Sequence, residues 1–134
     1  MSTSHNVSML ISGLICGMIL FQSAIVAPIV FKKLAGDQAK VFLRTLFPRL
    51  FKLCAFLGLI SLGQLFVWSN AAMFSASHIV ALLTVIAMAT CNALVPATNL
   101  ARDEGNQDKF DKLHKVSVYL TMFVLISNLS WIYF

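Results

Sequence analysis

The sequence of 134 residues is poor in charge, and no Asp, Glu, Lys or Arg lies in the middle of its long apolar stretches. Charged residues make up 11% of the chain, with ten Lys and Arg against five Asp and Glu. Pumps that couple transport to protons or ions need an ionisable group that changes state within the membrane. The missing group argues against that class of transporter.

Motifs of the common enzyme classes are absent as well. The chain has no Ser/His/Asp or Cys/His arrangement and no glycine-rich phosphate loop. Its three cysteines, Cys16, Cys54 and Cys91, fall inside apolar stretches and form no C-x-x-C pair, which indicates buried free thiols. We therefore expect a protein that is not an enzyme, with no catalytic residue and no metal site.

Apolar residues dominate the chain, at 59% of the sequence. Four stretches come close to or exceed the roughly 18 to 20 residues that cross a bilayer core. They cover residues 6–31, 50–68, 78–95 and 116–133. The sequence predicts an all-α protein, an integral membrane four-helix bundle that forms one domain over residues 1–134.

Basic residues occupy only two segments, 32–52 and 102–115, each between two apolar stretches. Short loops that carry Lys and Arg stay in the cytoplasm. This rule places both basic segments inside and both termini outside. We expect the protein to reside in a bacterial inner membrane, with no nucleic-acid partner.

A short helix that lies in the membrane interface is predicted between the first two spans, over residues 37–47. Asp37 can cap it, and apolar residues alternate there with Lys40 and Arg44. Pro48 should end it, because the residue before a proline avoids helical geometry. Six basic residues on and around this segment are expected to contact lipid headgroups: Lys32, Lys33, Lys40, Arg44, Arg49 and Lys52.

The first span contains two small residues, Gly13 and Gly17, at a spacing that lets a second helix approach closely. We expect them to pack within the bundle, and self-association is the alternative. Pro28 lies near the inner end of the same span and predicts a kink there.

Four amide side chains lie in the interior of the predicted spans, away from their ends, and polar groups in a membrane need partners. Gln22 and Asn92 should lie at one depth, and Gln64 and Asn128 at another. We predict two hydrogen-bonded amide pairs that join helices and act as structural glue.

Four motifs carry a family resemblance. They are the stretch 21–34 around Pro28, the triplet 46–48, residues 89–92 followed by Pro96, and the stretch 110–117. In this order they resemble the transmembrane-protein-205-like, or DUF4149-type, family of four-helix membrane proteins. Members of that family often carry His early in the first helix and Trp shortly after it, where this chain has Ser8 and Ile15.

The resemblance implies structural roles for certain positions and no activity, because the family is largely a domain of unknown function. The positions carried over are Pro28, Phe31, Phe47, Pro48, Asn92, Pro96, His114 and Ser117. The family is also distantly similar to copper-resistance-D-like and protoporphyrinogen-oxidase-like four-helix proteins. That similarity implies a haem or copper role as an alternative.

We interpret the chain as a non-enzymatic accessory or packing subunit of a larger membrane complex, without a cofactor. Its partners would be membrane lipids, other membrane subunits or a second copy of itself. One alternative is a redox protein that binds haem or copper through His114, with Asn92, Ser117 or a ligand from another subunit. The other is an exporter of small molecules or metals.

The orientation can be tested with one cysteine in a cysteine-free background. Asn106→Cys lies in the second basic segment, so we expect its thiol to react with a membrane-impermeant maleimide only after the membrane is opened. Labelling of intact cells from the outside would reverse the predicted topology.

Overall fold

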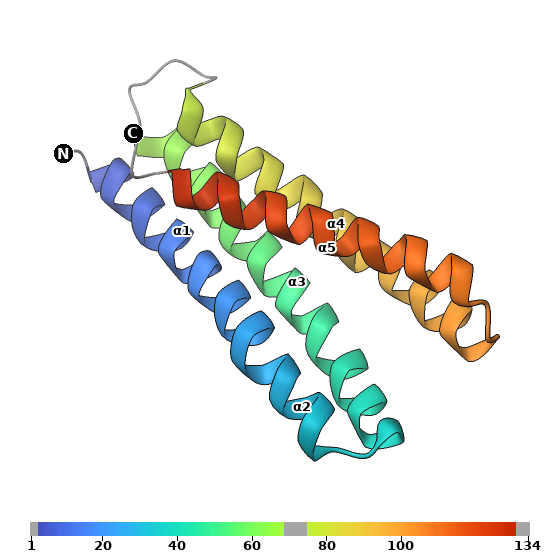
Figure 1. The fold of residues 1–134 in the computed structure, drawn as a ribbon. Coiled ribbons are helices and arrows are strands. Elements are labelled where there is room, and N and C mark those ends of the chain that lie inside the picture. The colour runs from blue at the N-terminus through green and yellow to red at the C-terminus, as the bar shows by residue number, and fades with distance from the viewer. Residues whose placement is uncertain (1–2, 69–74, 131–134) are drawn as a thin grey trace.

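The computed structural model describes residues 3–68 and 75–130, and this part of the chain folds into four long helices (Figure 1). The prediction of an all-α four-helix protein is confirmed. The helical segments are α1 (Thr3–Phe21), the π-helical turn η1 (Gln22–Val26), α2 (Ala27–Lys33), α3 (Gly36–Trp68), α4 (Ala76–Asp103) and α5 (Gln107–Leu129).

The first helix is continuous from α1 through η1 into α2 and passes Pro28 without ending. Proline lacks an N–H and crowds the carbonyl one turn before it. The π-helical turn comes directly before Pro28, and the Ala27 N–H bonds to the Gln22 carbonyl, five residues back. The irregularity expected at Pro28 therefore takes the form of one widened helical turn.

The prediction that Pro48 ends a separate interfacial helix is wrong. Residues 37–47 are the first turns of α3, a helix of 33 residues that contains Pro48 in its interior. Near Pro48, Arg44 pairs with Asp103 of α4, and the Phe47 ring lies 5.9 Å from that of Phe51.

The third span also continues past its predicted end. Pro96 lies inside α4, which runs on to Asp103. Gly105 then turns the chain with a φ of 73°, a left-handed conformation that suits glycine. The Asn106 side chain accepts a hydrogen bond from the Lys109 N–H and so caps the start of α5.

Three helices of the described residues are long and apolar enough to cross a membrane: Thr3–Lys33, Gly36–Val67 and Ala76–Asp103. The fourth predicted span, 116–133, is described only as far as residue 130, in α5. The length and composition of the first three helices indicate an integral membrane protein.

The four helices form two antiparallel hairpins, one of α1–α2 with α3 and the other of α4 with α5 (Figure 1). The start of α1 lies at the same end of the bundle as the end of α5, and we call this the terminal end. At the opposite end, the α2–α3 and α4–α5 turns lie well apart, and we call this the turn end. The hairpins thus converge at the terminal end and splay at the turn end.

A continuous apolar core joins all four helices in the half of the bundle nearer the terminal end. Its buried members are Ile11, Ile15, Cys16, Ile19, Phe51, Cys54, Ala87, Met88, Cys91, Val124 and Leu125. The three cysteines are free thiols, all buried in this core.

Close helix packing occurs at Gly58 rather than at the predicted glycine pair. A Cβ atom added at Gly58 of α3 would lie 2.9 Å from the Val85 side chain of α4. A Cβ added at Gly13 or Gly17 would meet nothing within 4 Å. The expectation that Gly13 and Gly17 pack within the bundle is therefore wrong, because α1 turns them outward.

Gly58→Ala should lower the thermal stability of the purified protein in detergent. The new methyl group overlaps the stiff Val85 side chain, and overpacking of this kind costs about 1–3 kcal/mol. Gly63→Ala is the matched control, because it changes the same residue type on the same helix where the space is open. Equal melting temperatures for the two variants would contradict the close α3–α4 approach.

Candidate functional site

Buried polar side chains join three helices near the terminal end. The Ser12 hydroxyl donates to Asn128 Oδ1 at 2.8 Å, and Asn128 Nδ2 donates to Thr84 Oγ1 at 2.9 Å. All three residues are buried, and they come from α1, α5 and α4. A single amide therefore links three helices through two hydroxyl groups.

A second set of bonds attaches α3 to α1. Gln64 Nε2 donates to Ser8 Oγ at 2.6 Å and to the Ser4 carbonyl at 3.3 Å. Gln64 and both serines are buried. Within the described residues, Gln64 Oε1 and Ser4 Oγ have no hydrogen-bond partner. Together the two sets, Ser4, Ser8, Ser12, Gln64, Thr84 and Asn128, form what we call the polar interior.

The predicted amide pairs do not form. Gln64 and Asn128 each bond to hydroxyl groups instead of to one another. Gln22 is buried and accepts from its neighbour Ser23, and Asn92 is half-buried with no side-chain hydrogen bond among the described residues. Two amides at equal depth bond to one another only if their side chains also point toward each other, so the direction of each side chain decides its partner.

The residues that sequence reasoning missed are the serines of α1. Ser4, Ser8 and Ser12 recur at every fourth position, so they lie on one face of the helix. This spacing was the available signal for a polar stripe that faces into the bundle.

The space beside Ser12, Thr84 and Asn128 is tightly closed. Ser12, Gly58, Thr84 and Asn128 border a small hollow between the helices that has no room for a water molecule. Ser12, Thr84 and Asn128 are therefore already bonded to one another, and they hold their three helices together at this point.

Ion pairs join the two hairpins at the turn end. Arg44 of α3 donates to both oxygens of Asp103 of α4, at 2.7 and 3.2 Å, and to the Asn99 carbonyl at 3.2 Å. The Lys40 ammonium lies 2.7 Å from the same carboxylate. Lys40 and Arg44, predicted to contact lipid headgroups, are therefore engaged with Asp103.

Asp103 lies in the last turn of α4, whose 28 residues extend about 42 Å and so outrun a hydrocarbon core of about 30 Å. Hydrogen bonds from Arg44 and then Lys40 lower the pKa of this carboxyl to about 2. The carboxylate remains charged throughout the physiological pH range, so the ion pairs persist there.

His114 lies exposed on α5, where its ring stacks on Phe110 with centroids 5.7 Å apart. The Arg102 guanidinium lies 5.1 Å from the centre of the same Phe110 ring. Ser117 is half-buried, and its carbonyl accepts from the Cys91 thiol at 3.7 Å. No group of three or more His, Cys, Asp or Glu residues that could hold a metal occurs in the described ranges.

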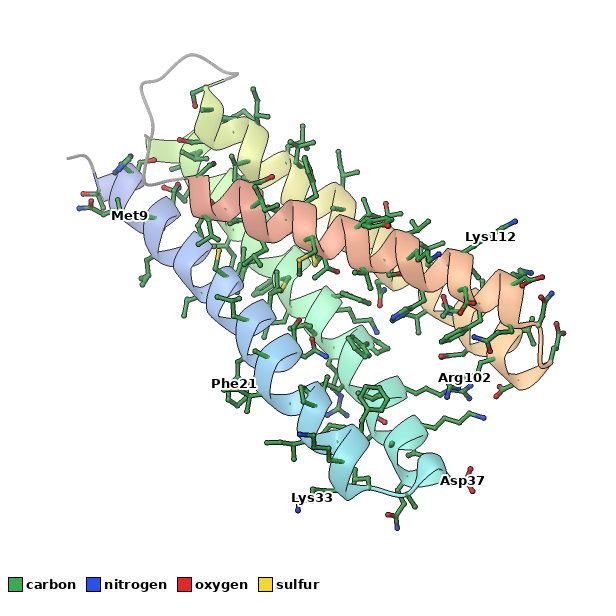
Figure 2. The ribbon with its side chains drawn as sticks, viewed as in Figure 1. Met9, Phe21, Lys33, Asp37, Arg102 and Lys112 are labelled. Atoms are coloured by element: carbon green, nitrogen blue, oxygen red, sulfur yellow. The ribbon has the colours of Figure 1, made fainter. Side chains whose placement is uncertain are left out.

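The other predicted positions are mostly on the surface. Pro28, Phe31 and Pro96 are exposed, whereas Phe47 and Pro48 are half-buried. Figure 2 shows Lys33 at the tip of α2, at the turn end. Four basic residues are exposed and make no ion pair within the described residues: Lys32, Lys33, Arg49 and Lys52.

A comparison with protein families shows which family the chain belongs to. A family model described as a domain of unknown function, DUF4149, matches residues 10–107. The chain belongs to the DUF4149 family. No curated protein and no solved structure matches it.

The match confirms the DUF4149-type resemblance that the motifs indicated. Three of the four motifs lie within the matched residues of this DUF4149 protein, and the stretch 110–117 lies beyond them. The narrower likeness to transmembrane-protein-205-like members stays a prediction. The matched region runs from within α1 to the first residue of α5, so it covers most of the first apolar helix and all of the other two that are apolar enough to span a membrane.

Replacing Asn128 should weaken the bundle, while replacing Asn92 should not. Asn128→Leu leaves the buried Ser12 hydroxyl without its acceptor, and hydrogen bonds between membrane helices contribute about 0.6–2 kcal/mol. Asn92→Leu removes an amide that makes no described bond. Thermal unfolding of both variants in detergent provides the measurement, and equal loss of stability would argue against the Asn128 network.

Proposed function

We propose that this DUF4149 protein is a non-enzymatic integral membrane protein that serves as an accessory subunit of a larger membrane complex. The observation that carries the proposal is the outward face of α1. A shallow groove runs along it, lined by Asn6, Met9, Leu10, Gly13, Leu14, Gly17, Met18 and Phe21. Figure 2 shows Met9 and Phe21 along this helix, at the edge of the bundle.

The groove suits a transmembrane helix better than lipid alone. Association of helices in a bilayer depends on close packing, because lipid tails are as apolar as the side chains they would replace. Gly13 and Gly17 leave open space that the chain's own helices do not fill. A partner helix that packs there would approach the α1 backbone closely, as Gly58 allows between α3 and α4.

The membrane arrangement belongs to the same proposal. We place the turn end in the cytoplasm of a bacterial cell and both termini outside, since all the Lys and Arg residues lie in segments 32–52 and 102–115. α5 would be the fourth span, because it packs against α4, which is long enough to cross. Lipids and at least one membrane subunit, or a second copy of the chain, would be the partners.

The haem alternative depends on His114, and the surroundings of this residue do not fit a haem site. The ring is exposed and stacked on Phe110, and no described contact joins it to Asn92. A haem needs axial ligands that face it across a pocket. The chain would therefore need a ligand and a pocket wall from another subunit, so we propose a role without a cofactor.

Purification at native expression level tests the proposal. A gentle detergent extract of a tagged protein is resolved by size, the co-purifying proteins are quantified by mass spectrometry, and the visible spectrum of the same sample is recorded. We expect a stoichiometric complex that falls at least about tenfold in the Gly13→Leu/Gly17→Leu variant, because bulky residues at a glycine contact prevent close approach.

Gly63→Leu is the matched control, since it places the same side chain at an equally open glycine on α3 and should leave the complex intact. A chain that migrates alone without a partner would contradict the accessory role. A chain that migrates alone with a Soret band would instead support the haem alternative.

A further inference from the structure

The basic residues of α3 divide into two pairs with different surroundings. Lys40 and Arg44 bind the Asp103 carboxylate of α4, so their charge is neutralised in part within the protein. Arg49 and Lys52 are exposed and make no ion pair anywhere in residues 3–68 and 75–130. One turn apart on the helix, these two cations remain available for an anion from outside the chain.

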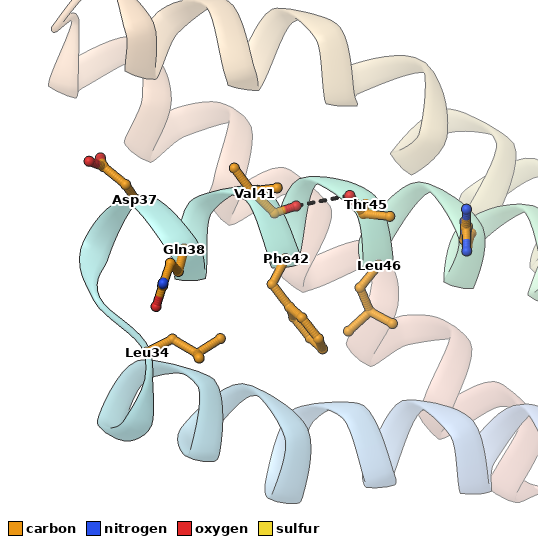
Figure 3. Close-up of a pocket in the computed structure, with 8 residues that line it drawn as sticks. Leu34, Asp37, Gln38, Val41, Phe42, Thr45 and Leu46 are labelled. Atoms are coloured by element: carbon orange, nitrogen blue, oxygen red, sulfur yellow. Dashed lines mark hydrogen bonds between the residues drawn. The ribbon is translucent and has the colours of Figure 1, made fainter.

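On its turn-end side, Arg49 borders an apolar groove. The groove follows the first turns of α3, and Leu34, Phe42 and Leu46 contribute to its walls along with Arg49. Figure 3 shows the Leu34, Phe42 and Leu46 side chains turned into the space between α2 and α3. Arg49 therefore stands at the end of this groove that is nearer the middle of α3.

On the terminal-end side of Arg49 lies a second apolar surface. Leu53, Phe56 and Ile60 follow Arg49 by four, seven and eleven residues, so they form one stripe along the same face of α3. All three are exposed. The stripe from Arg49 to Ile60 is about 16 Å long, close to half of a hydrocarbon core of about 30 Å.

This order of groups matches one leaflet of a bilayer. A phospholipid has its phosphate at the edge of the hydrocarbon and its acyl chains directed toward the midplane. With the phosphate at Arg49 and Lys52, the chains would lie along Leu53, Phe56 and Ile60. Guanidinium groups bind phosphate oxygens through two parallel hydrogen bonds, and an ammonium adds a point charge.

We propose that Arg49 and Lys52 form a binding site for the phosphate of one anionic phospholipid in the cytoplasmic leaflet. The leaflet assignment rests on the proposed function, specifically on the cytoplasmic position of the turn end. The two positive charges of the site favour an anionic lipid. A zwitterionic headgroup carries its own cation, which Arg49 and Lys52 would repel. Two of the six residues predicted to contact headgroups would thus bind the same phosphate.

Native mass spectrometry of the purified protein tests the site. The protein is exchanged into detergent micelles that contain phosphatidylglycerol or phosphatidylcholine with the same acyl chains, and the retained lipids are counted. We expect the wild type to retain one phosphatidylglycerol more tightly than phosphatidylcholine. Arg49→Gln/Lys52→Gln should weaken that retention by about thirtyfold, the change expected for the loss of two basic residues at an anionic lipid surface.

Lys40→Gln is the matched control, because it removes one positive charge from the same helix at a residue already paired with Asp103. It should retain phosphatidylglycerol as the wild type does. The melting temperature of the double variant should equal that of the wild type, since both side chains are exposed.

Equal retention by the double variant and the wild type, or equal retention of the two lipids by the wild type, would overturn the phosphate site. If the proposed accessory role proves wrong, the expected lipid binding stays the same, because it is measured on the purified protein without a partner. Outside labelling of Asn106→Cys would overturn the leaflet assignment alone.

Discussion

The fold depends on the need to satisfy polar groups inside a bundle that is otherwise apolar. Asn128 meets this need by accepting from Ser12 and donating to Thr84, which ties α5 to α1 and α4. Gln64 ties α3 to α1 through its Nε2 group, which donates to Ser8, while its Oε1 has no partner among the described residues. In hydrocarbon an unbonded amide is costly, so these contacts select one rotation of each helix about its axis.

The rest of the structure follows from where that network lies. It holds the four helices together at the terminal end, and the apolar core continues from it toward the middle of the bundle. At the turn end the hairpins diverge, and the charge cluster of Lys40, Arg44 and Asp103 joins α3 to α4. The polar contacts between helices are thus buried, neutral hydrogen bonds at the terminal end and exposed ion pairs at the turn end.

The surfaces carry the proposed roles because the interior is occupied by its own contacts. Gly13 and Gly17 open α1 to a neighbouring helix, and Arg49 with Lys52 presents unpaired charge beside an apolar stripe. Both surfaces are suited to partners found in a membrane, a helix in one case and an anionic lipid in the other. Membership of the DUF4149 family is consistent with a membrane protein and specifies no reaction.

The amino-acid sequence by itself determined the helical class, the apolar helices and the family, because hydropathy and motif order are local properties of the chain. It could not determine that Pro48 lies within α3, that Gly58 and not Gly13 makes the close contact, or that Asn128 bonds to Ser12. It also could not separate Lys40 and Arg44, which pair with Asp103, from Arg49 and Lys52, which do not. Only the tertiary structure decided these points, because each depends on the direction in which a helix face points and on which distant residue meets it.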